Sequence, residues 1–339
     1  MSQLIISSDS HVIEPHDLWI ERLPARFKDQ APKYEPTTRF QHHDGGKDPK
    51  KRISEMFLDG VSSEVLYASL ALAHYSLPAE LQEACFRVYN DWLIEYCSHV
   101  PDRLFGIGLI PCYRIDKAIE EVEHCKKAGM RGVMVWQAPP AELAFTTKHY
   151  ERLWAVCQDL QMPVSLHTLT GAPYGVNRDV PKELTARLTV AVNNKLMYSV
   201  ESLLQVITSG VLERFPKLKF VLVETEVSWI PSVMYQWDRY FSKGNRSTGE
   251  LKMTPSEYFK RQVYATFFND QPASMVFPHW GVDNCMWSND FPHPNSTWPN
   301  SREVIHRDIG NLSQSSKDKL LWENCAKLYD LPIHEAVPA

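Results

Sequence analysis

Short runs of hydrophobic residues alternate with longer amphipathic segments along most of this chain. The short runs have the length and pattern of strands, and the longer segments carry apolar residues at helical spacing. Strands are expected at residues 4–11, 61–69, 104–111, 132–136, 163–167, 218–224, 262–268 and 285–290. Helices are expected at residues 78–100, 116–128, 150–161, 229–240, 271–277, 301–309 and 315–329. A further long helix is expected to end at about residue 209, and the pattern does not fix where it starts. Repeated strand–helix units imply parallel strands.

Eight such units predict a closed (β/α)8 barrel that takes up the whole chain, residues 1–339, as a single domain. An open doubly wound sheet is the alternative, but its usual glycine-rich nucleotide loop does not follow any early strand. The Pro- and charge-rich stretch at 14–60 shows little periodicity, so we expect an insertion or lid after the first strand. Residues 315–339 are expected to form a C-terminal helix and tail.

Composition narrows the possible partners. The net charge of −5 and the pI near 6.2 argue against a nucleic-acid or anionic-membrane binder, which favours a small-molecule substrate. No apolar run is long enough to span a bilayer. Met1 leads almost directly into a strand, leaving no room for a signal peptide, so a cytoplasmic protein is expected. The seven scattered cysteines contain no Cys-x-x-Cys and are expected to be buried free thiols.

Candidate chemistry lies at the ends of the expected strands. Asp9 and His11, two apart on the first strand, point the same way and can supply two metal ligands, although a solvated strand end looks the same. A barrel brings the C-terminal ends of its strands to one mouth. Three further strands end in His167, Glu224 and Asp290. We therefore predict a metal site of Asp9, His11, His167 and Asp290, with Glu224 as an additional candidate.

Two imidazoles and two carboxylates fit zinc, manganese or ferrous iron better than magnesium or calcium, and zinc is the first expectation. The fourth strand carries no lysine, so a dinuclear site bridged by a carboxylated lysine is not expected. Glu224 has several candidate roles: general acid or base, hydrogen-bond partner of a ligand, ligand to a second ion, or structural residue.

Several aromatic residues lie at or beyond strand ends and are candidates for lining a pocket for a flat substrate. Alternatively, these large side chains pack under loops and do not contact a substrate. The residues in question are Trp136, Tyr174, Trp229, Trp287 and Trp298.

Together these motifs resemble the amidohydrolase-related group of the amidohydrolase superfamily, which includes aminocarboxymuconate semialdehyde decarboxylase and γ-resorcylate decarboxylase. The resemblance covers most of the chain outside 14–60 and 240–260. It is carried by Asp9-Ser-His-Val-Ile-Glu-Pro15, Asp102-Arg-Leu-Phe-Gly-Ile-Gly-Leu-Ile-Pro111, Gly129-Met-Arg-Gly-Val133, Pro163-Val-Ser-Leu-His167, Ser209-Gly-Val-Leu-Glu-Arg-Phe-Pro216, Ser288-Asn-Asp-Phe-Pro-His293 and Asn324-Cys-Ala-Lys-Leu328.

The resemblance implies that the four predicted ligands hold the metal and that Asp290 also handles a proton. Asp9 stands where relatives have His or Glu. The larger departure is Glu224, because many members place a catalytic histidine there. His293, in the turn after Asp290, is a candidate substitute for that histidine or a residue that locks the loop.

The expected reaction is hydrolysis or non-oxidative decarboxylation of a small carboxylated or carbonyl-containing substrate, with the metal activating water or polarising the substrate. Two alternatives remain at this point. Glu224 could complete a dinuclear iron or manganese site of an oxygenase, or the chain could be a partner subunit that keeps the barrel for assembly. A homodimer or higher oligomer is expected, with a hetero-oligomer of related chains as the alternative.

Overall fold

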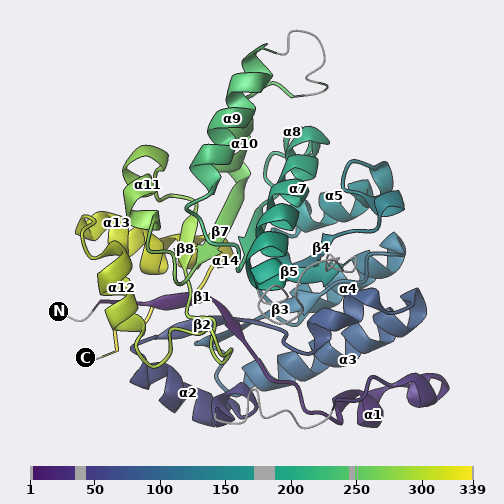
Figure 1. Cartoon of the computed structure of the whole chain (residues 1–339). Helices are drawn as coiled ribbons and strands as arrows, with labels where there is room; N and C mark the ends of the chain where they lie inside the picture. Colours follow the sequence, from purple (N-terminus) through teal and green to yellow (C-terminus); the bar gives the residue numbers. More distant parts are fainter. Residues whose placement is uncertain (1–2, 35–42, 172–187, 244–248, 250, 338–339) are drawn as a thin grey trace.

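Eight parallel strands form the centre of the protein and follow one another around a barrel in sequence order (Figure 1). The computed structural model describes residues 3–34, 43–171, 188–243, 249 and 251–337. The strands are β1 (Ile6–His11), β2 (Ser63–Tyr67), β3 (Leu104–Leu109), β4 (Gly132–Ala138), β5 (Val164–Gly171), β6 (Phe220–Val223), β7 (Val263–Phe267) and β8 (Cys285–Trp287). Nearly all strand residues are buried, as expected for strands covered by helices.

Helices surround the strands on the outside of the barrel (Figure 1). They are α1 (Leu18–Arg22), α2 (Pro49–Leu58), α3 (Ala79–Ser98), α4 (Ile115–Lys127), α5 (Glu151–Asp159), α7 (Lys195–Thr208), α8 (Val211–Arg214), α9 (Ile230–Lys243), α10 (Pro255–Gln262), α11 (Ala273–Trp280), α12 (Ser301–Ile309), α13 (Gln314–Asp318) and α14 (Asn324–Tyr329). Among the described residues, none of these helices is both long and apolar enough to cross a membrane.

The seam between β8 and β1 closes the barrel. Parallel ladders join each strand from β1 to β8 to the next one. Two backbone hydrogen bonds then connect the last strand to the first: the His11 N–H donates to the Phe291 carbonyl at 2.6 Å, and the Asp290 N–H donates to the Asp9 carbonyl at 3.1 Å. The (β/α)8 barrel predicted from the sequence is confirmed.

The strands β6 and β8 end earlier than the sequence predicted, and the residues that carry their acidic groups have a left-handed backbone. The expected strand at 285–290 stops at Trp287, and Asp290 has a positive φ of 56°. The expected strand at 218–224 likewise stops before Glu224, whose φ is 60°. Such left-handed residues cannot continue a strand, because their backbone turns away from the ladder. Both carboxylates are therefore carried by turns at the barrel mouth.

The stretch at 14–60 contains more regular structure than its pattern indicated. It includes α1 and α2, and the side chain of Asp48 accepts the Lys50 N–H at 2.8 Å to cap α2. Two residues of α2, Arg52 and Met56, are buried. The hydrophobic pattern missed this helix because one of its two core-facing positions is an arginine.

Other helices also differ from the expected boundaries. The sequence reading placed no helix at 255–262, where α10 begins after Thr254, whose N–H donates to the Glu257 carboxylate at 2.7 Å. The expected helix at 315–329 is divided by a π-helical turn, Lys319–Glu323. All seven cysteines are free thiols, and six of them are buried.

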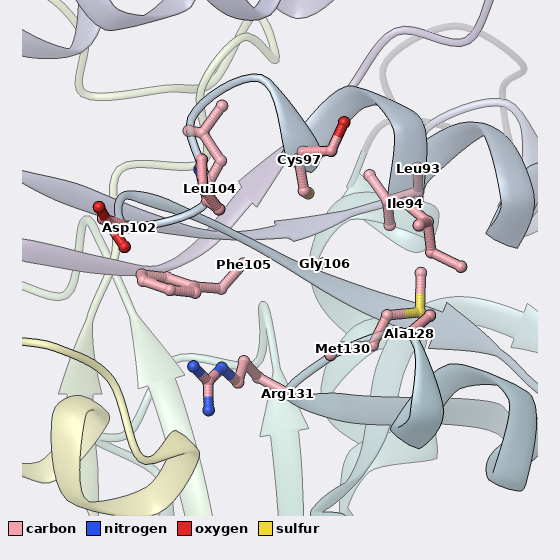
Figure 2. A pocket seen from close by; sticks show the side chains of 13 residues that line it. Leu93, Ile94, Cys97, Asp102, Leu104, Phe105, Gly106, Ala128, Met130 and Arg131 are labelled. Carbon is pink, nitrogen blue, oxygen red and sulfur yellow. The ribbon is translucent and has the colours of Figure 1, made fainter.

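A cavity of about 390 Å³ lies at the amino end of β3, between α3 and the turn that follows α4 (Figure 2). Leu93, Cys97, Leu104, Met130 and Arg131 are among the residues that line it. Leu104 begins β3 and Arg131 directly precedes β4, so this cavity opens at the barrel end opposite to the one where the predicted site residues lie.

Candidate metal centre

Four side chains meet at the C-terminal mouth of the barrel. Asp9 and His11 extend from β1, His167 extends from β5, and Asp290 follows β8. His11 Nε2 lies 3.4 Å from Asp9 Oδ1 and 3.4 Å from Asp290 Oδ1. The same nitrogen lies 3.4 Å from Nε2 of His167. All four residues are at most 1 % exposed. The structure thus brings together the four residues that the sequence predicted as metal ligands.

Backbone carbonyls fix the orientation of both imidazoles. His11 Nδ1 lies 2.7 Å from the Ala68 carbonyl, and His167 Nδ1 lies 2.8 Å from the Thr168 carbonyl. A carbonyl can only accept, so each Nδ1 carries the proton and each Nε2 presents a lone pair. Two lone pairs facing each other at 3.4 Å repel unless a cation lies between them. This arrangement is the usual preparation of histidine for metal binding.

The carboxylates of Asp9 and Asp290 supply the complementary charge. Both oxygens of Asp9 and Oδ2 of Asp290 are buried. None of these three atoms has a hydrogen-bond partner among the described residues. A buried carboxylate without partners costs several kcal/mol, about 3 or more, and a divalent cation removes that cost. Two imidazole nitrogens and two carboxylates form a donor set that fits zinc, manganese or iron.

Burial is the main influence on the pKa of two residues of this cluster, Asp290 and His167. Burial raises the pKa of Asp290 well above its usual range, and the negative charge of Glu224 raises it further. Burial also lowers the pKa of His167 to about 4. Both shifts describe the site without an ion, in which the protein favours the uncharged form of each group.

Glu224 lies beside the ligand cluster and is paired with a residue that the sequence did not identify as part of the site. The ammonium group of Lys195, the first residue of α7, donates to Glu224 Oε1. Thr168 Oγ1 donates to Glu224 Oε2 at 2.9 Å, and that oxygen lies 3.7 Å from His167 Nε2. Both carboxylate oxygens of Glu224 therefore have partners within the protein.

The pairing determines the charge of Glu224. Burial alone would raise its pKa, but the attraction of Lys195, His167 and His293 outweighs burial and lowers the pKa below its usual range. For Lys195, burial acts to lower the pKa, and the attraction of Glu224 raises it above the usual value. A carboxylate and an ammonium group therefore face each other beside the ligand cluster.

His293 lies at the centre of the site as well. Its Nδ1 is 2.8 Å from Asp290 Oδ1, and its Nε2 is 3.2 Å from Ser69 Oγ. The ring stacks on that of His11, with 3.9 Å between centroids and an interplanar angle of 30°. These contacts are compatible with either role predicted for His293, replacing a catalytic imidazole or locking the loop.

The predicted aromatic pocket residues are dispersed. Trp136 is fully buried, and its indole N–H donates to Tyr150 Oη at 2.9 Å. The indole N–H of Trp229 donates to the Thr225 carbonyl at 3.0 Å. Tyr174 lies outside the described residues.

The two other tryptophans differ in their hydrogen bonding. The indole N–H of Trp298 donates to the Glu55 carbonyl at 2.9 Å. Trp287 is buried on β8, and its indole N–H has no hydrogen-bond partner among the described residues. Contact of these aromatic residues with a substrate stays a prediction.

Sequence reasoning missed the polar residues that support the cluster. Glu14 accepts the backbone N–H groups of Ser69, Leu70 and Ala71 at 3.1, 2.9 and 3.1 Å. This holds the turn that contacts both His11 and His293. The sequence shows Glu14 five residues after Asp9 but does not indicate its contacts. It does not indicate that Lys195 faces the mouth, because the pattern does not fix where the helix of Lys195 starts.

Comparison with known protein families identifies the family of this chain. The Amidohydro_2 model of the amidohydrolase family matches residues 59–331, which is most of the chain. The chain belongs to this amidohydrolase family. The resemblance inferred from the sequence motifs is confirmed.

The family relatives with similar sequences include decarboxylases. γ-Resorcylate decarboxylase from Rhizobium sp. (strain MTP-10005) is 22% identical over 256 residues, covering 68% of this chain and 74% of the relative. The 2-amino-3-carboxymuconate-6-semialdehyde decarboxylase of Caenorhabditis elegans is 20% identical over 332 residues, covering 84% of this chain and 81% of the relative.

A solved family structure shows the same fold. The dihydroxybenzoic acid decarboxylase from Polaromonas sp. JS666, with bound manganese and the inhibitor 2-nitroresorcinol, superposes with a TM-score of 0.71 at 18% sequence identity. The superposition covers 97% of each chain.

Proposed function

We propose that this protein is a metal-dependent carboxy-lyase that removes CO2 without oxidation from a small hydroxylated aromatic or related unsaturated carboxylic acid. The buried cluster of Asp9, His11, His167 and Asp290 carries the proposal, because its ligand atoms lie close together and neither oxygen of Asp9 has a hydrogen-bond partner among the described residues. The decarboxylase relatives and the manganese in the Polaromonas enzyme support the class of reaction and the kind of ion.

The four residues of the cluster would hold one divalent ion, manganese or zinc. When bound, the ion supplies a positive charge that orients and polarises a carboxylate and a neighbouring oxygen. Asp290 would hold a proton at its Oδ and deliver it to the ring carbon that loses CO2. The burial of the site excludes water from that carbon, which protects the carbanionic character that decarboxylation requires.

Lys195 and Glu224 would have a separate task beside the ligand cluster. Glu224 is ionised and keeps both of its oxygens engaged, so it cannot itself donate a proton. Lys195 has further N–H donors that can hold the carboxylate or hydroxyl oxygen of a substrate. The pair would therefore present a cation where many relatives place a histidine.

The other three readings of the site are less well supported. Hydrolysis would use the same cluster with water in place of the carboxylate, and no observation favours it over lysis. An oxygenase would require Glu224 as a ligand for a second ion, but its oxygens are already occupied by Lys195 and Thr168. A non-catalytic partner subunit would have no need for the buried carboxylate of Asp9, whose two oxygens have no hydrogen-bond partner among the described residues.

The proposal is tested by incubating the manganese- and zinc-loaded protein with 2,6-dihydroxybenzoate and a panel of hydroxylated benzoates. We expect release of CO2 from at least one acid and, in D2O, one deuterium at the carbon that carried the carboxylate. The His167→Ala variant provides the control for contaminating activity. Cleavage of amides or lactones without CO2 release, or consumption of oxygen, would contradict the proposal.

A further inference from the structure

Arg52 is a buried cation for which the proposed reaction has no use. It lies on α2, within the stretch that the sequence reading treated as an insertion, and is 0 % exposed. Its Nε lies 2.5 Å from Glu64 Oε2 on β2. Its Nη1 donates to the backbone carbonyl of His11, and its guanidinium carbon lies 4.9 Å from the ring centroid of Phe291. One side chain thus contacts two strands and the residue after Asp290.

These contacts converge on the seam that carries three of the four predicted ligands. The His11 N–H donates to the Phe291 carbonyl across the seam, so Arg52 touches both partners of that hydrogen bond. Next to it, Ser10 Oγ donates to Asn289 Oδ1 at 2.8 Å and lies 3.3 Å from Glu64 Oε1. Charged and polar side chains therefore hold the ends of β1 and β8 together beside Asp9, His11 and Asp290.

We propose that Arg52 is a positioning residue for the metal centre: its contacts with His11, Glu64 and Phe291 hold the two seam strands at the spacing that the ion requires. This inference rests on the proposed metal site. A metal site tolerates displacements of only about 0.5 Å in its ligands, and groups that orient ligands typically change metal affinity by about 10- to 100-fold. Displacing the His11 peptide moves its imidazole directly, whereas the Ala68 carbonyl fixes only the direction of the ring.

A purely structural ion pair would behave differently. It would change the stability of the fold and leave the metal affinity of the folded protein unaltered. The positioning role requires coupling between the two, and such coupling is reciprocal: if Arg52 strengthens metal binding, the bound metal must strengthen the contacts of Arg52. Metal affinity and local protection therefore separate the two roles without an activity assay.

The first experiment compares Arg52→Lys with Arg87→Lys. Arg87 forms an Arg–Glu pair on the barrel exterior, with its Nε 2.9 Å from Glu121 Oε2 and its side chain 44% exposed, and serves as the control for the same substitution away from the seam. Circular dichroism establishes folding, and competition with a chromogenic chelator gives the dissociation constant for Mn²⁺. We expect affinity at least tenfold weaker for Arg52→Lys and within twofold of the parent for Arg87→Lys. A folded Arg52→Lys variant with parental affinity would overturn the proposal.

A second experiment uses the unaltered protein and so does not depend on the folding of a variant. Hydrogen exchange is measured with Mn²⁺ and with EDTA. We expect Mn²⁺ to slow exchange in residues 49–58 of α2 as well as at the ligand strands, with no change in α4. Protection of β1 and β5 without protection of α2 would refute the positioning role. Absence of any Mn²⁺ binding would instead contradict the proposed metal site.

Discussion

On the ligand side of the mouth, which comprises Asp9, His11, His167 and Asp290, the two carboxylates face two imidazoles and form no ion pair with a lysine or arginine of the described residues. On the side next to it, at the end of β6, the carboxylate of Glu224 is paired with Lys195 of α7 and also accepts from Thr168. Both sides bury acidic groups within the same mouth, and they differ in where the compensating cation originates.

The difference indicates how one barrel mouth can hold both a metal and a substrate. Where the chain leaves carboxylates unpaired, an external cation is required, and the site is prepared for an ion. Where the chain supplies its own ammonium group, a further ion would be repelled, and the remaining donors of that group are available for an anion. We therefore expect substitutions on the first side to abolish metal binding and substitutions on the second to affect turnover with the metal retained.

The largest effect is expected from His167→Ala on the ligand side. Loss of the Nε2 lone pair removes one of four ligands, so bound metal should fall from about one ion per chain to below about 0.1, and turnover should disappear with it. Metal content after dialysis against metal-free buffer provides the measurement. His149→Ala is the control, because His149 is directed at the Cys112 carbonyl outside the cluster. Unchanged metal content in His167→Ala would exclude it as a ligand.

Lys195→Met tests the other side. We expect kcat to fall by about 100-fold or more with metal content unchanged, because the substrate loses its cation while the ligands stay in place. Stability should also fall by about 3–5 kcal/mol, because Glu224 becomes an unpaired buried carboxylate. The double variant Lys195→Met/Glu224→Leu should recover most of that stability and none of the activity. Parental kcat in Lys195→Met would remove Lys195 from the reaction.

Glu224→Gln should give a smaller loss than Lys195→Met. The amide oxygen can still accept from Lys195, while an NH2 group replaces the oxygen that accepts from Thr168. The charge that fixes the ammonium group is also lost, so we expect kcat to fall by about tenfold at unchanged metal content. Steady-state kinetics at saturating Mn²⁺ measures this change. Loss of one of two bound ions in this variant would show instead that Glu224 is a metal ligand, and full activity would make Glu224 a structural residue.

The smallest effect concerns a buried imidazole away from the centre. Burial lowers the pKa of His74 to about 3, below about 6.5 in an unfolded chain. The unfolded chain therefore binds more protons below pH 6.5, and the free energy of unfolding should fall as pH falls toward 3, by about 2 kcal/mol at pH 5 from this residue. Urea unfolding of the parent and of His74→Phe at pH 7 and pH 5 measures the difference. The difference between the two proteins should be the same in Mn²⁺ and in EDTA, because His74 lies away from the metal ligands. Equal pH dependence of unfolding in the parent and in His74→Phe would contradict the lowered pKa of His74.

The sequence predicted one side of this comparison far better than the other. Asp9, His11, His167 and Asp290 each close or follow a hydrophobic run, and a barrel necessarily brings such positions together. Lys195 was not predicted, because a helix start without a recognisable cap hides which residue faces the mouth. Arg52 was missed for a related reason: a buried charge makes a core-facing helix look polar. The lid at 14–60, the oligomeric state and the pocket tryptophans stay predictions.

The central claim is that the unpaired side of the mouth holds a single divalent ion. It is tested most directly by elemental analysis of the parent protein, purified without chelator and loaded with Zn²⁺ or Mn²⁺ before removal of the excess. We predict one ion per chain, because Glu224 is already paired with Lys195. Two ions per chain, or none, would contradict the account.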